Sequence, residues 1–373
     1  MIYSNNIYSM SALKHIRHNM STNVSISELQ KERETFQDVL PRVIDSLITT
    51  PKLLDVPEFS MWMKKILDYN LAGGKKNRGL TTVLAYETFE KPENITEESL
   101  RQSRTMGWCV EMLQAYLLMT DDIMDGSTTR RGVPCWYRLP EVGLGAINDT
   151  ILMYTSIMEI LKTHFGHTKQ YTHIVNLFNE TLMFTSVGQH LDYTMAQRKK
   201  NDYSLFTIER YNAIVKYKTS YYTFKLPVCL GMLLANNTDP ESHKRAEGIC
   251  LEIGHLFQMQ DDFIDCFGAE SVTGKAGTDI QEGKCSWLAV SALQRCSEAQ
   301  RGVFASCYGS KQPAHVERVQ RLYEQLGLPQ LYRSEERARY DAVVASVRSL
   351  QSTTDLPPEL FLRMLDMIYK RKQ

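Results

Sequence analysis

The sequence has no net charge, no long apolar run and few residues that break helices. Its 43 Lys and Arg balance 43 Asp and Glu, which argues against a nucleic-acid binder that works through a broad basic surface. The longest apolar run, residues 226–235, is about half of what a membrane-spanning helix needs. We therefore expect no nucleic-acid partner and no transmembrane segment.

Closely spaced cysteine pairs are also absent. The eight cysteines are scattered singly along 373 residues, and none belongs to a Cys-x-x-Cys pair, so neither a zinc ribbon nor a thioredoxin-like redox site is indicated. Scattered single cysteines are typical of a reducing compartment, and we expect a cytoplasmic protein. Residues 1–27 contain no Asp or Glu and are expected to form a flexible extension. Their composition is that of a transit peptide, which makes a mitochondrial location the alternative.

What is present is helical periodicity over most of residues 28–373. Apolar residues recur with a period near 3.6, and alternating segments typical of β-strands are lacking. The pattern predicts helices over 106–125, 150–163, 177–195, 211–235, 245–267, 286–304, 314–326 and 335–350, and from Pro357 or Pro358 to the end. No linker or repeat interrupts them, so we expect residues 28–373 to form one all-α domain.

Two acidic clusters of the form Asp-Asp-x-x-Asp end two of these helices. The first is Asp121, Asp122 and Asp125, and the second is Asp261, Asp262 and Asp265. The first and last members of each cluster share a helix face and repel each other, with no basic residue within one turn. An apolar residue lies four positions earlier in both helices, which is typical of a cavity mouth. Carboxylates suit Mg²⁺, which shares its ligand shell with substrate phosphates. The pattern therefore predicts a site for a phosphate ester with an apolar tail.

Basic residues that could bind such a phosphate stand in two short motifs and one helix. Gly-Gly-Lys-Lys-Asn-Arg-Gly at 73–79 offers close backbone approach beside two cations, and Thr-Arg-Arg-Gly follows the first cluster at 129–132. Lys218 lies in an aromatic, apolar helix, where a lysine either snorkels or is functional. The glycine-rich segment 267–284 predicts a flap that carries Lys275 and Lys284 over the cavity.

Taken in order, these motifs resemble the trans-prenyltransferases, the polyprenyl synthase family, and among them the animal and fungal enzymes that make farnesyl diphosphate. The resemblance runs from about residue 30 to the C-terminus. It rests on the motifs at 73–79, 121–125, 129–132, Cys-Trp-Tyr at 135–137, Gly-Gln-x-Leu-Asp at 188–192, Lys-Tyr-Lys-Thr at 216–219, Gln-x-Gln-Asp-Asp-x-x-Asp at 258–265, and Gly-Lys-x-Gly-Thr-Asp at 274–279. It implies a single large helical bundle of the isoprenoid synthase fold around a deep central cavity.

The resemblance also implies an activity and a set of site residues. We expect a homodimer that uses three Mg²⁺ per site, with Mn²⁺ as a substitute, to condense isopentenyl diphosphate with dimethylallyl and geranyl diphosphates. By resemblance, Asp121, Asp122, Asp125, Asp261, Asp262 and Asp265 hold metal; Arg130, Lys218 and Lys275 bind the allylic diphosphate; Lys75, Arg78, Gln114 and Arg131 bind isopentenyl diphosphate; Lys218, Thr219 and Gln258 steady the allylic cation; and Lys284 and the basic tail 370–372 close the site.

Product length and reaction type leave alternatives open. Tyr116 and Leu117 lie one turn deeper than Asp121, where a growing tail would run. Farnesyl-producing members of the family often have two aromatic residues there, so Leu117 keeps a different product length open. The other alternative is a terpene synthase derived from the family, which ionises a prenyl diphosphate without condensation. The four residues expected to bind isopentenyl diphosphate favour the synthase.

Overall fold

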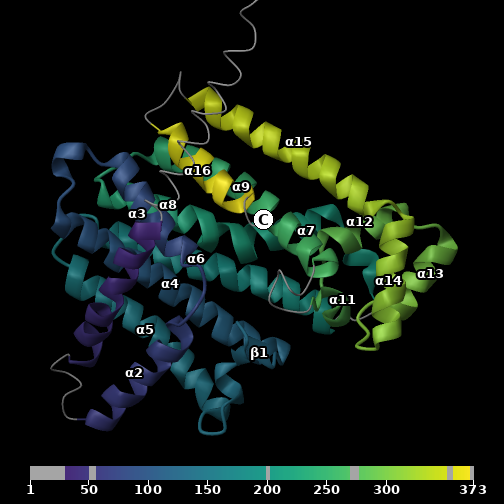
Figure 1. Cartoon of the computed structure of the whole chain (residues 1–373), viewed down its shortest axis with the longest axis horizontal. Helices are drawn as coiled ribbons and strands as arrows, with labels where there is room; N and C mark the ends of the chain where they lie inside the picture. Colours follow the sequence, from purple (N-terminus) through teal and green to yellow (C-terminus); the bar gives the residue numbers. More distant parts are fainter. Residues whose placement is uncertain (1–29, 50–55, 199–201, 269–276, 351–355, 370–373) are drawn as a thin grey trace, which may run out of the picture.

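The computed structural model describes residues 30–49, 56–198, 202–268, 277–350 and 356–369, and these residues are almost entirely helical, which confirms the all-α prediction (Figure 1). After a first helix at residues 30–48 come α2 (Pro57–Leu71), α3 (Asn77–Phe89), α4 (Glu97–Asp125), α5 (Ala146–Phe165), α6 (Tyr171–Tyr193), α7 (Ile208–Ile214), the π-helix η7 (Val215–Lys225), α8 (Leu226–Leu234) and α9 (Pro240–Phe267). The C-terminal part contains α11 (Asp279–Glu282), α12 (Trp287–Arg295), α13 (Glu298–Cys307), α14 (Pro313–Gln325), α15 (Leu328–Ser349) and α16 (Pro358–Tyr369). The proposed extension at residues 1–27 lies outside the described residues.

The two helices that carry the acidic clusters begin at well-formed caps and end at the clusters themselves. Thr96 and Ser99 form a capping box at the start of α4, and the side chain of Asp239 accepts a hydrogen bond from the Ser242 N–H at the start of α9. Gly126 ends α4 directly after the first cluster, with a φ of 67°. Carboxylates at the C-terminal end of a helix meet the negative end of its dipole. Both clusters therefore need cations from elsewhere.

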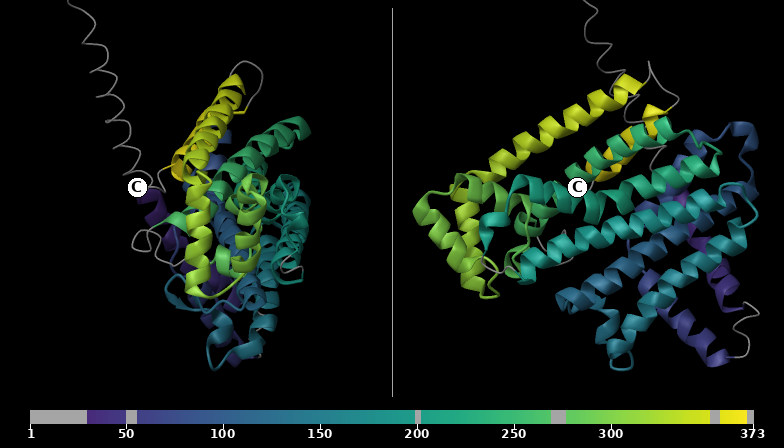
Figure 2. Two further views of the ribbon diagram at one scale, coloured as in Figure 1. Left: turned by 90° about the vertical axis from the view of Figure 1, so that its right-hand side faces the viewer. Right: turned by 180° about the vertical axis from the view of Figure 1, so that it is seen from behind.

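The π-helix η7 packs against both α6 and α9, within the stack of long helices seen in the back view of Figure 2. A Cβ atom added at Gly188 of α6 would lie 2.1 Å from the Lys218 backbone nitrogen. One added at Gly254 of α9 would lie 2.2 Å from the Ser220 hydroxyl oxygen. These two glycines therefore allow close backbone packing on both sides of η7, and they fix where Lys218 and its neighbours lie.

Helix α8 joins the two hydrophobic cores of the bundle. Leu226 and Leu230 pack into the core built from the N-terminal helices, α4 and α5, whereas Val228 and Met232 pack into the core built from α9 and the C-terminal helices. All four side chains are buried, so the helix is apolar on both faces. This shared helix ties the two halves of the described chain into one bundle.

The structure corrects three details of the sequence-based prediction. The helix expected over 286–304 is two helices, α12 and α13, because Ser297 and Gln300 form a capping box that starts a new helix. Helices α2 and α3 were not predicted, and α3 begins within the motif at 73–79. A minimal hairpin, β1 (Thr129–Arg130) with β2 (Val133–Pro134), follows α4.

Candidate active site

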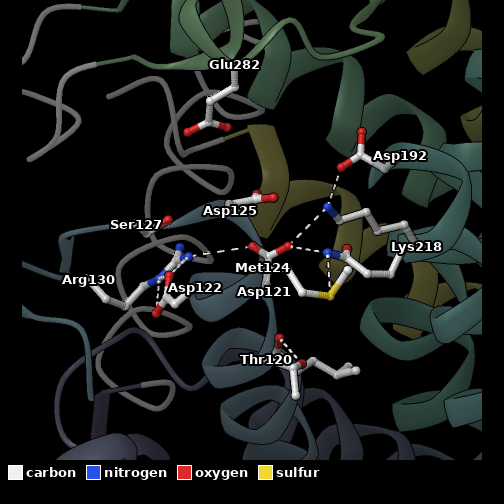
Figure 3. A network of polar contacts seen from close by, with 12 residues as sticks. Thr120, Asp121, Asp122, Met124, Asp125, Ser127, Arg130, Asp192, Lys218 and Glu282 are labelled. Atoms are coloured by element: carbon white, nitrogen blue, oxygen red, sulfur yellow. Dashed lines mark hydrogen bonds and ion pairs between the residues drawn. The ribbon is translucent and has the colours of Figure 1, made fainter. Parts of the chain in front are cut away.

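The first acidic cluster is contacted by Arg130 of the following hairpin and by Lys218 of the distant η7 (Figure 3). The Asp121 carboxylate lies 3.3 Å from the Lys218 ammonium and 3.7 Å from the Arg130 guanidinium. Burial by itself would raise the pKa of Asp121, but Lys218, then Lys284 and Arg130, outweigh burial and lower it. Asp121 is therefore held as a carboxylate at the mouth of the site.

Asp192 of α6 links two of these cations and was not among the predicted site residues. Its buried carboxylate accepts a hydrogen bond from Lys218 at 2.5 Å and one from Lys284 at 3.1 Å, and Lys284 also reaches Asp125 at 2.8 Å. Burial opposes ionisation of Asp192, yet the two lysines hold its pKa well below the usual range. The motif at 188–192 contained this aspartate, but only the fold shows which charges it pairs with.

The second cluster is hydrogen-bonded to the segment that follows it. The buried Asp262 carboxylate accepts hydrogen bonds from the Gln258 side chain and the Trp287 backbone N–H, both at 2.8 Å. Asp265 accepts from the backbone N–H groups of Thr278 at 3.3 Å and Asp279 at 3.0 Å. Segment 277–287 is thereby anchored to the end of α9.

Two connections link the two acidic clusters. Segment 277–287, which is bonded to the second cluster, also carries Lys284 to Asp125 of the first. Neighbouring residues of η7 do the same, because Lys218 reaches Asp121 while the Thr219 hydroxyl donates to Gln258 at 2.7 Å. The structure therefore brings together the two acidic helix ends, Lys218, Thr219, Gln258 and Lys284, as the sequence analysis expected. Lys275 and residues 370–372 lie outside the described residues.

Within each cluster the middle aspartate is buried and holds a neighbouring group in position. Asp122 and Asp262 are both only 4% exposed. Asp122 is paired with the Arg130 guanidinium, whose Nε lies 3.1 Å from it. Of the outer aspartates in the first cluster, Asp121 keeps 22% of its side chain exposed and Asp125 only 7%.

The donor set fits Mg²⁺ that is shared with a substrate. In the part of the chain that the structure describes, no three His, Cys, Asp or Glu side chains gather closely enough to enclose a metal ion on their own. Mg²⁺ is usually held by one or two carboxylates together with waters and substrate phosphates. The outer aspartates at the ends of α4 and α9 are carboxylates of that kind, and Asp121 keeps 22% of its side chain exposed.

A pocket of about 180 Å³ lies between α3, α4, η7, α9 and α16. One part is lined by the four side chains expected to bind isopentenyl diphosphate, namely Lys75, Arg78, Gln114 and Arg131, and another by Phe224, Phe257, Met364, Met367 and Ile368. A cationic region beside an apolar one fits a diphosphate with a short hydrocarbon tail. The motifs at 73–79 and 129–132 therefore meet at one pocket, although 49 residues lie between them.

The basic side chains of this pocket are held by local contacts. Arg78 donates hydrogen bonds to Gln114 at 3.0 Å and to Tyr222 at 3.0 Å, and its guanidinium lies over the Tyr222 ring. Arg131 donates to the Ala72 carbonyl at 2.8 Å. A Cβ at Gly74, where φ is +75°, would lie 2.9 Å from the Arg131 guanidinium carbon, so glycine is needed for this approach.

Lys76 also lines the pocket and was missed by the sequence analysis as a site residue. It adopts a left-handed backbone conformation, with a φ of 52°, and buries its ammonium against the Leu71 carbonyl at 2.6 Å and over the Trp108 ring. Burial lowers its pKa to about 8, although Glu111 opposes this effect. Two adjacent lysines after a glycine pair were the available signal.

Lys225, His190 and residues 269–270 are unusual for the family that the sequence resembles. The buried Lys225 forms ion pairs with Glu180 of α6 and Glu247 of α9, each at 2.9 Å, and so ties η7 to both neighbouring helices. His190 is exposed on α6. Ala269 and Glu270 lie outside the described residues.

Comparison with known proteins decides the family. The sequence profile of the family described as polyprenyl synthetase matches residues 60–326. The chain belongs to the polyprenyl synthetase family. The proposed trans-prenyltransferase resemblance and the isoprenoid synthase fold are thus confirmed.

Relatives of this chain in the family include farnesyl pyrophosphate synthases of animals. The chain is 42% identical to farnesyl pyrophosphate synthase of Murgantia histrionica over 92% of this chain and 83% of that protein. It is 42% identical to that of Gallus gallus over 94% of this chain and 95% of that protein. The structure of T. brucei farnesyl diphosphate synthase complexed with risedronate aligns with a TM-score of 0.82 and 33% identity, over 91% of this chain and 98% of that one. No helix among the described residues of this polyprenyl synthetase has the length and hydropathy to cross a membrane.

Proposed function

We propose that this chain is a Mg²⁺-dependent farnesyl diphosphate synthase, and that residues 28–373 form its catalytic domain. The observation that carries the proposal is that one helix, η7, borders both the acidic clusters and the basic and apolar pocket. Lys218 and Thr219 face the acidic clusters, and one turn later Thr223 and Phe224 line the basic and apolar pocket. Two substrates that each carry a diphosphate and a hydrocarbon tail can therefore meet along η7.

The first chemical step is loss of diphosphate from the allylic substrate. Breaking this C–O bond leaves negative charge on the departing group, and a preorganised set of cations lowers the barrier. Lys218 and Arg130, which lie beside Asp121, and Lys284, which is paired with Asp125, would supply such cations. When bound by the outer aspartates, Mg²⁺ neutralises part of the same developing charge.

The second step joins the allylic carbon to the alkene of isopentenyl diphosphate. The allylic cation would lie beside the Lys218 and Thr219 backbone and Gln258, whose side chain is fixed between the Thr219 hydroxyl and Asp262. Lys75, Arg78 and Arg131 would hold the isopentenyl diphosphate, and the apolar lining from Phe257 and α16 excludes water. The proton released on bond formation would pass to the departing diphosphate.

The assay that tests this function supplies isopentenyl diphosphate with dimethylallyl or geranyl diphosphate, with and without Mg²⁺. We expect the fifteen-carbon farnesyl diphosphate from either allylic substrate, and loss of turnover when Mg²⁺ is removed with a chelator. Product chromatography measures the result. Products formed from geranyl or farnesyl diphosphate alone, without isopentenyl diphosphate, would instead support the terpene synthase alternative.

The same proposal includes a cytoplasmic homodimer. Ile147 and Ile151 of α5 and Met183 and Val187 of α6 are between 40% and 65% exposed, and α5 packs beside α6. Four large apolar side chains on one face support an isologous interface between two copies.

All eight cysteines are unpaired, which supports a reducing compartment.

Charge placed on this face should separate the subunits. We expect Ile151→Glu combined with Met183→Glu to convert the dimer to a monomer at micromolar concentration, because each carboxylate would be buried without a partner. Sedimentation or light scattering gives the mass. Met61→Glu on α2, which is 69% exposed, is the control and should leave the mass unchanged. A variant on the α5–α6 face that stays dimeric would contradict this interface.

A further inference from the structure

Three helices meet in one polar and aromatic contact below the first acidic cluster. The rings of Tyr116 on α4 and Tyr154 on α5 lie 5.6 Å apart at an interplanar angle of 45°. The Tyr154 hydroxyl donates a hydrogen bond of 2.6 Å to the Asn179 side-chain oxygen on α6. Tyr116 and Tyr154 are half-buried and pack against the N-terminal core.

This contact lies at the depth where a growing hydrocarbon tail would end. Tyr116 precedes Asp121 by five residues, which is about 7.5 Å along an α-helix. A product whose diphosphate is held at Asp121 extends its tail toward that level of α4. On α4 itself, Leu117 supplies an aliphatic side chain, so the second aromatic ring of this layer comes from α5.

We propose that Tyr154, oriented by Asn179, completes the floor that sets product length in this enzyme; this inference rests on the proposed function. Tyr154 supports the Tyr116 ring from the side of α5, so the tail cannot displace Tyr116 in that direction. The hydrogen bond to Asn179 lies at the exposed edge of this contact, so it contributes modestly to the orientation of Tyr154, and packing against the Tyr116 ring contributes the rest. Tyr154 is a specificity-determining residue, and Asn179 is a positioning residue.

The floor acts through the number of condensation cycles. Each cycle breaks the allylic C–O bond, forms one C–C bond to isopentenyl diphosphate, and releases one proton and one diphosphate. The tail grows by five carbons each time. A fifteen-carbon product that meets a fixed floor cannot seat its allylic carbon for another cycle, whereas a movable floor admits one more.

The test compares product lengths from isopentenyl and geranyl diphosphates. We expect Tyr154→Ala and Tyr154→Leu each to raise the ratio of twenty-carbon to fifteen-carbon product about tenfold, since removing bulk from an apolar pocket changes selectivity by roughly that factor. Tyr154→Leu keeps apolar volume and decides the question if the alanine variant does not fold. Tyr154→Phe and Asn179→Leu keep the ring but remove the hydrogen bond, and we expect a smaller shift of the same ratio in both.

A matched control separates floor effects from general damage to α5. Thr155 is exposed, and its hydroxyl bonds only to carbonyls of its own helix, so Thr155→Ala should leave the ratio unchanged. The inference is overturned if the parent makes farnesyl diphosphate while Tyr154→Ala and Tyr154→Leu give the same ratio as Thr155→Ala. A parent that forms no condensation product would instead overturn the proposed function.

Discussion

Replacing Asp121 by Asn is expected to lower kcat by roughly a thousandfold, with the fold retained. The change removes a negative oxygen from the first cluster and, under the proposed function, one metal ligand, and losses of this kind cost about 10²–10³ in kcat per preorganised electrostatic contact. It also removes the charge that faces Lys218 and Arg130. The measurement is steady-state turnover across a range of Mg²⁺ concentrations, and we expect half-activation to move to higher Mg²⁺.

Asp68 of α2 provides the matched control for this experiment. It forms an exposed ion pair with Lys64, and Asp68→Asn removes a carboxylate of the same kind from a solvated surface, where such pairs contribute little. We expect parental kcat in this variant. If Asp121→Asn also turned over within about threefold of the parent at the same Mg²⁺ concentration, Asp121 would not be a metal ligand.

Asp192→Asn should produce the second largest loss, in both stability and activity. The buried carboxylate balances two ammonium groups, Lys218 and Lys284. Without it, two partly buried cations repel each other, and since the loss of one partner of a fully buried ion pair typically costs about 3–5 kcal/mol, we expect a loss at the lower end of that range. Because Lys218 would shift away from the allylic site, we also expect kcat to fall by roughly 10²-fold. Chemical denaturation and turnover measure the two effects.

The pH dependence separates this charge effect from a simple packing defect. The pKa of Asp192 is lower in the folded than in the unfolded chain, so its contribution to stability is fully present above about pH 4 and is lost as pH falls through the folded value. The difference in unfolding free energy between parent and Asp192→Asn should therefore narrow below about pH 4. A difference that stays constant from pH 7 to pH 3 would contradict the electrostatic explanation. Asp341→Asn, at an exposed ion pair with Arg337, is the control.

The sequence predicted best those features that a single helix or motif determines. The spacing of Asp121 and Asp125 places both on one face of α4 wherever that helix packs, and the short motifs carry Lys75 and Arg78 within one turn of each other. The all-α fold follows from helical periodicity over most of the chain. These inferences needed no knowledge of tertiary contacts.

The missed features depend on contacts between distant segments. The repulsion within each acidic cluster was expected to be relieved by metal, because no basic residue lies within one helical turn, yet Lys218 and Lys284 form ion pairs with the first cluster across 97 and 159 positions. The role of Asp192 follows from the same contacts. The break between α12 and α13 depends on one capping box, which the apolar periodicity on either side concealed.

The π-helical winding of η7 also changes how this segment must be read from its sequence. A π-helix bonds residue i to i+5, whereas an α-helix bonds i to i+4, so side chains stacked along η7 are spaced more widely in sequence than on an α-helix. A helical wheel drawn at about 100° per residue therefore assigns side chains between Val215 and Lys225 to the wrong faces.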